Sequence, residues 1–363
     1  MSARPSLARV VREWGRIGCV GFGGPPAHIA LLRELCVDRR RYLRADEFES
    51  AIAVTGLLPG PASTQMAIFT AWRVRGTAGA LAGGLAFIVP GLIAVIALSA
   101  LFLASAPPRW VVAAGLGAGA AVPAVALQAG GSLLGPSWRG ARGRRRRWIL
   151  YLAAGAAAAA TAGPWVVVVL LGCGLAEAGI AMAAFLPVAV VGTGGLLSLV
   201  WVAFKVGALS YGGGFVVIPL MQADAVDHFH WLTSTQFLNA VALGQVTPGP
   251  VVHTVAAVGY AARGVGGALL AAFVAFGPSF AFVLAGGPRF ERVRSNRTVA
   301  AFLAGAGPAA IGAILGSAIP LADALHHGWQ AAVLAVAAVA LLVLRRGVVP
   351  TLLGAALVGV VVF

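Results

Sequence analysis

Two short runs decide the fold of this chain: TGLLPGPAST at residues 55–64 and GQVTPGPVVH at residues 244–253. Each run places Pro-Gly-Pro inside an apolar stretch, and the two runs lie in opposite halves of the sequence. Proline removes a backbone donor and glycine tolerates non-helical backbone, so both runs interrupt a helix. The sequence therefore predicts broken helices at matching places in two related halves.

The composition indicates that these breaks lie in a lipid bilayer rather than in water. Of the 363 residues, 60% are hydrophobic and 10% are charged, whereas soluble domains carry about 25% charged residues. Apolar runs of about 20 residues, the length that crosses a bilayer, recur at 76–104, 110–134, 166–185, 264–284, 299–321 and 330–344. Strands of a membrane β-barrel would alternate apolar and polar residues instead. We predict an all-α polytopic membrane protein with about 10–13 membrane segments, some of them broken or re-entrant.

The net charge of +15 is concentrated in short loops between the apolar runs. The arginine clusters lie at 39–44, 73–75, 139–147, 289–297 and 345–346. Because arginine in short loops marks the cytoplasmic side of a membrane protein, the charge needs no nucleic-acid partner, and we predict none. Lys205 is the only lysine, and Ala and Gly are abundant. This bias is typical of a GC-rich bacterial genome.

The two halves repeat one pattern. GCVGFGGPPAHIALL from residue 18 aligns with GALSYGGGFVVIPLM from residue 207 at an offset of 189 (212 − 23 = 189). The same offset superimposes the two Pro-Gly-Pro runs, and an offset of 188 (263 − 75 = 188) superimposes the two Arg-Gly pairs that follow. We therefore predict an N-terminal transporter repeat over 1–185, a linker over 186–194 and a C-terminal repeat over 195–363.

The loops indicate opposite orientations for the two repeats. The arms around the first Pro-Gly-Pro, at 48–58 and 62–72, hold 11 residues each, which as helix span about 16 Å, or half a bilayer. Basic loops flank both arms, so we predict a re-entrant hairpin that enters and leaves on the cytoplasmic side. In the second half the run QADAVDHFHWLTSTQ contains two aspartates and no Arg or Lys, which indicates an external loop. We expect an inverted repeat.

The breaks also predict a binding site. Unpaired backbone groups in hydrocarbon cost about several kcal/mol, so such breaks persist only where protein or a watery cavity satisfies them. Matched broken helices in two repeats are typical of a transporter binding site, although kinks and close helix packing use the same residues. A helix N-terminus offers free N–H groups and partial positive charge to an oxyanion. We expect the breaks to surround one midplane cavity that favours an anion, above all a dianion.

The candidate substrate-binding residues are those of the breaks and the polar residues beside them. They are Gly23, Gly24, Pro25, His28, Pro59, Gly60, Pro61, Gln65, Lys205, Gly212, Gly213, Gly214, Gln245, Thr247, Pro248, Gly249, Pro250 and His253. His28 and His253 can also carry protons near neutral pH. Arg16 and Glu177 are candidates for a substrate or coupling charge, with an interfacial or helix-end role as the alternative. The cysteines show no metal-ligand spacing, and we predict no metal and no cofactor.

Several runs carry a resemblance to a known family. They are FGGPPAHIALLRE (22–34), LPGPASTQ (58–65), FKVGALSYGGGFVVIPLMQ (204–222) and WLTSTQFLNAVALGQVTPGPV (231–251). With these runs the sequence resembles the chromate ion transporter family in its long, two-domain form. The resemblance implies a bacterial inner-membrane exporter that expels chromate, is driven by the proton gradient and confers chromate resistance. In such proteins we expect Asp at the position of Asn239, and this difference bears on proton coupling.

Two other functions fit the same residues. An importer or exchanger of sulfate or another oxyanion would use the same cavity in a different direction, and a membrane scaffold would use the breaks only for packing. The sequence contains no HExxH, no GxSxG and no paired intramembrane carboxylates, so we predict that the chain is not an enzyme. The expected partners are an oxyanion, the lipid bilayer and coupling protons. A homodimer is left open.

Overall fold

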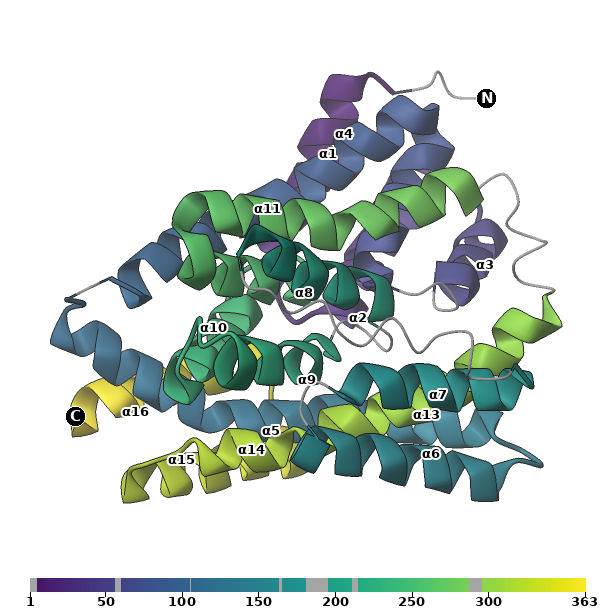
Figure 1. The fold of residues 1–363 in the computed structure, drawn as a ribbon. Helices are drawn as coiled ribbons and strands as arrows, with labels where there is room; N and C mark the ends of the chain where they lie inside the picture. Colours follow the sequence, from purple (N-terminus) through teal and green to yellow (C-terminus); the bar gives the residue numbers. More distant parts are fainter. Residues whose placement is uncertain are drawn as a thin grey trace.

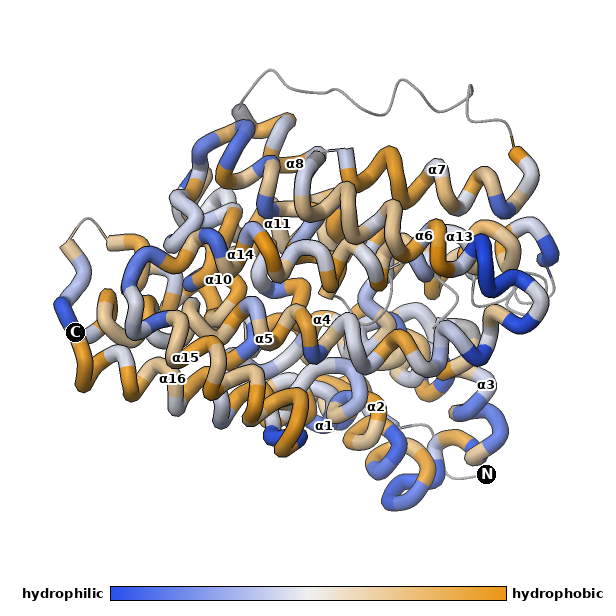
Figure 2. Tube along the Cα trace, turned by 90° about the horizontal axis from the view of Figure 1, so that it is seen from below, coloured by the Kyte–Doolittle hydropathy of each residue, from blue (hydrophilic) through white to orange (hydrophobic). Residues whose placement is uncertain are grey.

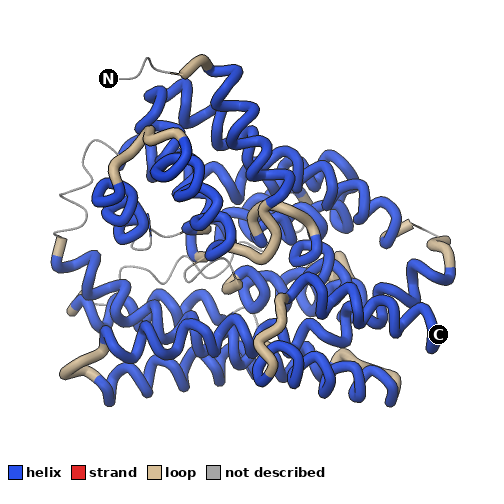
Figure 3. The backbone as a smooth tube through the Cα atoms, turned by 180° about the vertical axis from the view of Figure 1, so that it is seen from behind, coloured by secondary structure: helices blue, strands red, loops and turns tan. Residues whose placement is uncertain are grey.

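Helices make up nearly all of the described chain (Figure 1, Figure 3). The computed structural model describes residues 5–55, 60–104, 106–162, 165–180, 195–210, 215–286 and 296–363. Within these ranges there is no strand, and the prediction of an all-α fold is confirmed.

The helices follow the same order in the two halves. The first half contains α1 (Leu7–Val20), α2 (Pro25–Arg33) with the π-helix η1 (Glu34–Arg39), α3 (Ala45–Thr55), α4 (Ala62–Phe102), α5 (Arg109–Gly140), α6 (Arg145–Ala157) with η2 (Ala158–Ala162), and α7 (Val166–Ala178). The second half contains α8 (Leu196–Leu209), α9 (Val217–Gln222) with η6 (Ala223–His228), α10 (Ser234–Val246), η7 (Val251–His253), α11 (Thr254–Gly286), α13 (Arg297–Gly316), α14 (Ala318–Asp323), α15 (Gly328–Ala338) with η9 (Val339–Val343), and α16 (Val348–Val362). The predicted two-half layout is therefore present.

The long helices α4 and α11 each consist of a short arm and a longer segment that turns back on it. The turn lies at Arg75-Gly76 in α4 and at Arg263-Gly264 in α11, where the glycine φ angles are 65° and 60°. A Cβ added at Gly79 would overlap the carbonyl oxygen of Ala71, so the arm and the following segment are in close contact. The Arg-Gly pairs that matched in the sequence are thus equivalent helical hairpin turns, at which glycine supplies the left-handed conformation.

Where the structure describes the predicted apolar runs, they form helices. Among the described residues, α4, α5, α11 with η7, and α13 with α14 are long and apolar enough to cross a membrane, by length and composition. Shorter apolar helices include α7, α8 and α16. Figure 2 shows hydrophobic residues along the helices, with hydrophilic residues gathered near the ends of α3 and α6. The number of membrane segments remains a prediction.

Within each half the first helix packs on the long hairpin helix in the same way. A Cβ at Gly18 of α1 would overlap the backbone of Phe87 in α4, and a Cβ at Gly207 of α8 would overlap that of Ala275 in α11. Both pairs match at the offsets of the sequence repeat (207 − 18 = 189 and 275 − 87 = 188). Small residues at these positions let the helix backbones approach closely, as is common in membrane proteins.

The last helices of each half pack against the other half. The helices α6 and α7 pack on α13, and α15 and α16 pack on α5 (Figure 1). Glycines permit the close approach, since a Cβ at Gly312 of α13 would overlap the carbonyl oxygen of Leu152 in α6, and one at Gly117 of α5 would overlap that of Ala355 in α16. The two halves are therefore interlocked by an exchange of their final helices.

This exchange predicts a specific loss of stability. Gly312→Val should destabilise the folded protein by about 1–3 kcal/mol, because the new side chain forces α6 away from α13. Gly307→Val on the same helix is the control, because nothing lies within 4 Å of a Cβ at Gly307. Thermal unfolding of the two variants in detergent measures the difference, and equal melting temperatures would contradict the packing described.

Candidate functional site

The breaks of the two halves meet and exchange hydrogen bonds. The N–H of Gly249 donates to the carbonyl of Gly21 at 2.8 Å, and the N–H of Gly60 donates to the carbonyl of Ser210 at 3.2 Å. Gly21 and Ser210 correspond at the repeat offset of 189, as do Gly60 and Gly249. The two bonds are therefore a matched pair. Each Pro-Gly-Pro break is joined to the residue that precedes the Gly-rich run of the opposite half, and we call this meeting point the junction.

Backbone conformation explains why glycine and proline occupy the junction. Gly60 has a φ of 118° and Gly249 a φ of 89°, values that side chains rarely allow. Pro61 and Pro250 are extended and immediately precede α4 and η7. Gly24, with a φ of 76°, caps α2, and Pro25 occupies its first turn. Neither α2 nor α4 has a side-chain cap, so the N–H of Ala27, which follows the two prolines that begin α2, and the first three N–H groups of α4 have no partner from the cap residue.

Each Pro-Gly-Pro break lies against helices of the other half. A Cβ at Gly60 would lie 3.2 Å from the carbonyl oxygen of Gly207 and 3.4 Å from Oγ of Ser279. A Cβ at Gly91 of α4 would overlap the carbonyl oxygen of Pro248. Gly91 and Ser279 also correspond at the offset of 188 (279 − 91 = 188). The junction is therefore closely packed by equivalent positions of α4 and α11.

Two buried histidines lie on either side of the junction. Nε2 of His28 is 2.9 Å from the carbonyl oxygen of Gly21, the same oxygen that accepts the bond from Gly249. The His28 ring packs edge-on against Phe87, with ring centroids 5.1 Å apart. His253 packs edge-on against Phe276 at 5.3 Å. Both imidazoles are fully buried, so each can act only on a partner inside the protein.

Several polar atoms near the junction have no partner within the described part of the chain. They are Nδ1 of His28, Oγ1 of Thr64, Nε2 of Gln245 and Oγ of Ser279. A buried polar group without a hydrogen bond costs about 1–3 kcal/mol. The side chains of Thr64, Gln245 and Ser279 can therefore donate to a small anion beside the breaks, in a place closed to solvent. Nδ1 of His28 is an acceptor in the neutral ring, because Nε2 donates to the Gly21 carbonyl.

The structure brings most of the predicted break residues to the junction. Besides the residues above, Gln65 lies there, since its Nε2 would be 2.7 Å from a Cβ at Gly60, and Gly23 (φ 96°) precedes the cap of α2. Thr247 is buried, but its hydroxyl donates to the carbonyl of Leu243 in its own helix at 2.8 Å. Pro59, Gly212, Gly213 and Gly214 lie outside the described residues.

Lys205 is buried, and its charge is paired with a carboxylate. Its Nζ forms an ion pair with Asp224 of η6, and both side chains are at least nine-tenths buried. The Nζ also lies 5.8 Å from the centroid of the Trp201 ring. Asp224 belongs to the run predicted as an external loop, whereas the structure places it in a π-helix packed inside the protein.

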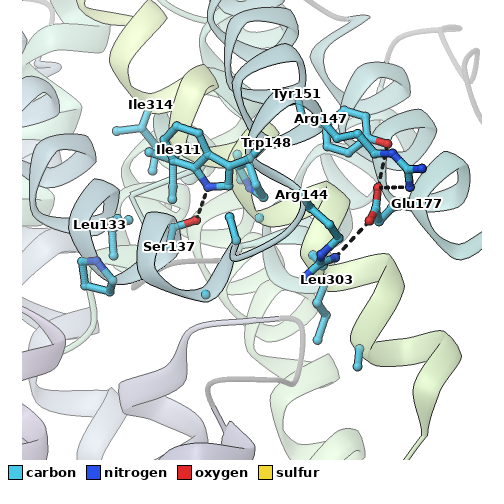
Figure 4. Close-up of a pocket in the computed structure, with 18 residues that line it drawn as sticks. Leu133, Ser137, Arg144, Arg147, Trp148, Tyr151, Glu177, Leu303, Ile311 and Ile314 are labelled. Atoms are coloured by element: carbon cyan, nitrogen blue, oxygen red, sulfur yellow. Dashed lines mark hydrogen bonds and ion pairs between the residues drawn. The ribbon is translucent and has the colours of Figure 1, made fainter.

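The two candidate coupling charges lie elsewhere. Arg16 is exposed on α1, in a shallow pocket of about 110 Å³ that also contains Glu13 and Glu34. Glu177, near the end of α7, accepts hydrogen bonds from Arg144 and from the hydroxyl of Tyr151, each at 3.0 Å (Figure 4). The structure does not bring either residue to the junction.

Asn239 is also away from the breaks. It lies on α10 against α5, where its Nδ2 would be 2.8 Å from a Cβ at Gly115. Its Oδ1 has no hydrogen-bond partner among the described residues. An aspartate here would place a carboxylate at the contact between two helices rather than at the junction.

Some junction residues were missed from the sequence. Gly21, Gly91 and Ser279 were not among the candidates, although Pro90-Gly91 and Pro278-Ser279 align at the offset of 188 (278 − 90 = 188). That alignment was the available signal, because it marks a third pair of equivalent proline positions, here inside helices α4 and α11. No sequence signal identified Asp224 as the partner of Lys205.

Comparisons with known proteins agree with this architecture. The family model described as Chromate transporter matches residues 8–178 and 197–360, one segment in each half. A chromate transport protein from Cupriavidus metallidurans is 30% identical, with 99% of this chain and 94% of that protein covered. A chromate transport protein from Pseudomonas aeruginosa is 32% identical, with 88% and 82% covered.

A probable chromate transport protein from Synechococcus elongatus is 27% identical, with 89% of this chain and 86% of that protein covered. No solved structure shows significant similarity to the chain. The paired segments of the family model coincide with the two halves that meet at the junction, and the apolar helices identify a multi-pass membrane protein. The resemblance noted from the Gly-rich and Pro-Gly-Pro runs is thereby confirmed: this chain belongs to the chromate transporter family.

Proposed function

We propose that this chain exports chromate across the bacterial inner membrane, with protons as the coupling ion, and so confers chromate resistance. The observation that carries the proposal is the reciprocal pair of hydrogen bonds at the junction, from Gly249 to Gly21 and from Gly60 to Ser210. Broken helices of two repeats that meet in this way are the usual setting of a transporter binding site. The names of the relatives supply the substrate.

We further propose how the junction holds a tetrahedral dianion. The N–H of Ala27 in α2, which begins with two prolines, and the first N–H groups of α4 donate to its oxygens, as helix N-termini do for phosphate and sulfate. Thr64, Gln245 and Ser279 supply side-chain donors that have no other partner in the described chain, and His28, whose Nε2 donates to Gly21, adds a donor at Nδ1 only when its ring is protonated. Because the charge of Lys205 is balanced by Asp224, the anion is held mainly by oriented dipoles.

The orientation of the repeats belongs to the same proposal. The halves, over 1–185 and 195–363 with a linker at 186–194, face opposite sides of the membrane, so the junction lies near the midplane. The arginine-rich turn between α5 and α6 marks the cytoplasmic side. With one Pro-Gly-Pro break in each half, the same set of donors can be reached from either side in turn.

Chromate flux in membrane vesicles tests this function. Energised inside-out vesicles containing the chain should accumulate labelled chromate, and a protonophore should abolish the accumulation, because export in the cell is uptake in such vesicles. Cells that make the chain should accumulate less chromate than cells that lack it. Equal chromate levels in the two strains would contradict export, and uptake of labelled sulfate in preference to chromate would favour the sulfate transporter instead.

A further inference from the structure

The helices α3 and α10 are equivalent in the repeat but are packed differently. On α10, Leu238 and Ala242 are buried and Asn239 is half-buried, because α10 lies against α5 (Figure 1). The offset of 189 maps these three residues onto Glu49, Ser50 and Ala53 of α3. All three are exposed. The same face of the same repeat helix is therefore covered in one half and uncovered in the other.

The repeat also predicts which surface would pack against α3. On α5, Gly115 and Gly119 are the positions that contact α10. A Cβ at Gly119 would lie 3.2 Å from Cβ of Leu238. The offset of 188 maps these two glycines onto Leu303 and Gly307 of α13 (303 − 115 = 188). Leu303 and Gly307 line a pocket of about 500 Å³ between α5, α6, α7 and α13 (Figure 4). The pocket thus lies where the repeat predicts a docked α3.

The charges of the two surfaces are complementary. The uncovered face of α3 includes Asp46 and Glu49, which lie three residues apart and so on one side of the helix. In this structure they form exposed ion pairs with Arg44 and Arg33, which are weak in water and can be exchanged. The pocket contains Arg144 and Arg147, whose side chains are 40% and 65% exposed and share the carboxylate of Glu177 (Figure 4). Two guanidinium groups share one carboxylate, so a net positive charge remains, and docking would exchange the present arginine partners of Asp46 and Glu49 for Arg144 and Arg147.

We propose that α3 docks into this pocket in a second conformation, with Ser50 against Leu303 and Gly307, while α10 leaves α5. The two repeats then exchange their packing. The helix α3 ends at Thr55, just before the Gly60 break, and α10 ends at Val246, just before the Gly249 break. Movement of either helix therefore acts directly on the junction. The exchange opens the junction to one side of the membrane and then the other, and this inference rests on the proposed transport function.

Cysteine pairs test the exchange. In a background without the three native cysteines, Gly115→Cys with Asn239→Cys reports the packing seen here, because Cγ of Asn239 lies 3.0 Å from a Cβ at Gly115. Ser50→Cys with Leu303→Cys reports the second conformation. We expect both pairs to crosslink in oxidised membrane vesicles, each with a loss of transport that a reducing agent restores. Ser50→Cys with Leu353→Cys, which pairs α3 with an exposed position on α16, is the control and should not crosslink.

Failure of the exchange and failure of the transport function are separate results. If both pairs crosslink but the protein moves no chromate, the result supports the exchange and contradicts the proposed chromate transport. A transporting protein in which only the 115–239 pair crosslinks overturns the exchange. Spin labels at Ala53 and Ala300, both exposed, provide a measurement that needs no buried substitution. Two distance populations support the exchange, and a single population overturns it.

Discussion

Gly249→Ala should lower chromate transport about tenfold or more, with the protein still present in the membrane. Gly249 has a φ of 89°, and a Cβ there would lie 3.0 Å from Cε1 of His253. An alanine in left-handed backbone costs about 1–2 kcal/mol, and each 1.36 kcal/mol is about a tenfold change in a rate. The break can relieve this strain only by turning its N–H away from Gly21, which removes one of the two hydrogen bonds that join the halves.

A matched control distinguishes loss of the junction hydrogen bond from the general effect of backbone strain at a glycine with positive φ. Gly264→Ala introduces an alanine at a φ of 60°, where nothing lies within 4 Å of the new Cβ. Gly60→Ala, at the repeat-related position, should behave like Gly249→Ala. Initial rates of chromate uptake by inside-out vesicles, normalised to the amount of protein, give the comparison. If Gly249→Ala transports as well as Gly264→Ala, the geometry of the junction is not needed for transport.

The repeat made the junction predictable from sequence. Pro59-Gly60-Pro61 and Pro248-Gly249-Pro250 interrupt helices through local backbone chemistry, and their equal spacing from the Gly-rich runs implied equivalent places in space. The predicted first hairpin arm began at 48, whereas α3 begins at Ala45. The difference has a local cause, because Asp46 and Glu47 lie in the first turn of α3, where acidic side chains stabilise a helix N-terminus.

Helix partners were not predictable in the same way. The helices α7 and α16 are apolar on nearly every side, and such helices show no amphipathic stripe that points to a neighbour. Their exchange between α5 and α13 depends on glycines such as Gly117, Gly305 and Gly312, and in sequence these resemble the many other glycines of the chain. The Lys205–Asp224 pair depends on the approach of η6 to α8, which only the folded structure shows.

Lys205→Ala should reduce the amount of folded protein, in addition to any effect on transport. Lys205 and Asp224 are 5% and 7% exposed and form an ion pair. Removing one partner of a buried pair leaves an uncompensated charge and costs about 3–5 kcal/mol. Asp224→Ala should have a comparable effect, because it leaves the ammonium group unpaired. Membrane abundance and thermal unfolding of the two single variants measure this loss, and a single variant as stable as the parent would show that the pair is not closed in the membrane.

The double variant Lys205→Met with Asp224→Leu decides what the pair does for transport. Apolar side chains of similar volume can replace a buried ion pair at little cost, so we expect parental abundance. We also expect most of the chromate transport to return, because the pair is neutral as a whole and adds little field at the junction. In that case Lys205 acts by holding α8 against η6. A double variant that is stable but transports no chromate would instead show that the ammonium group itself binds the anion, the role predicted from its position in the apolar run before the Gly-rich break.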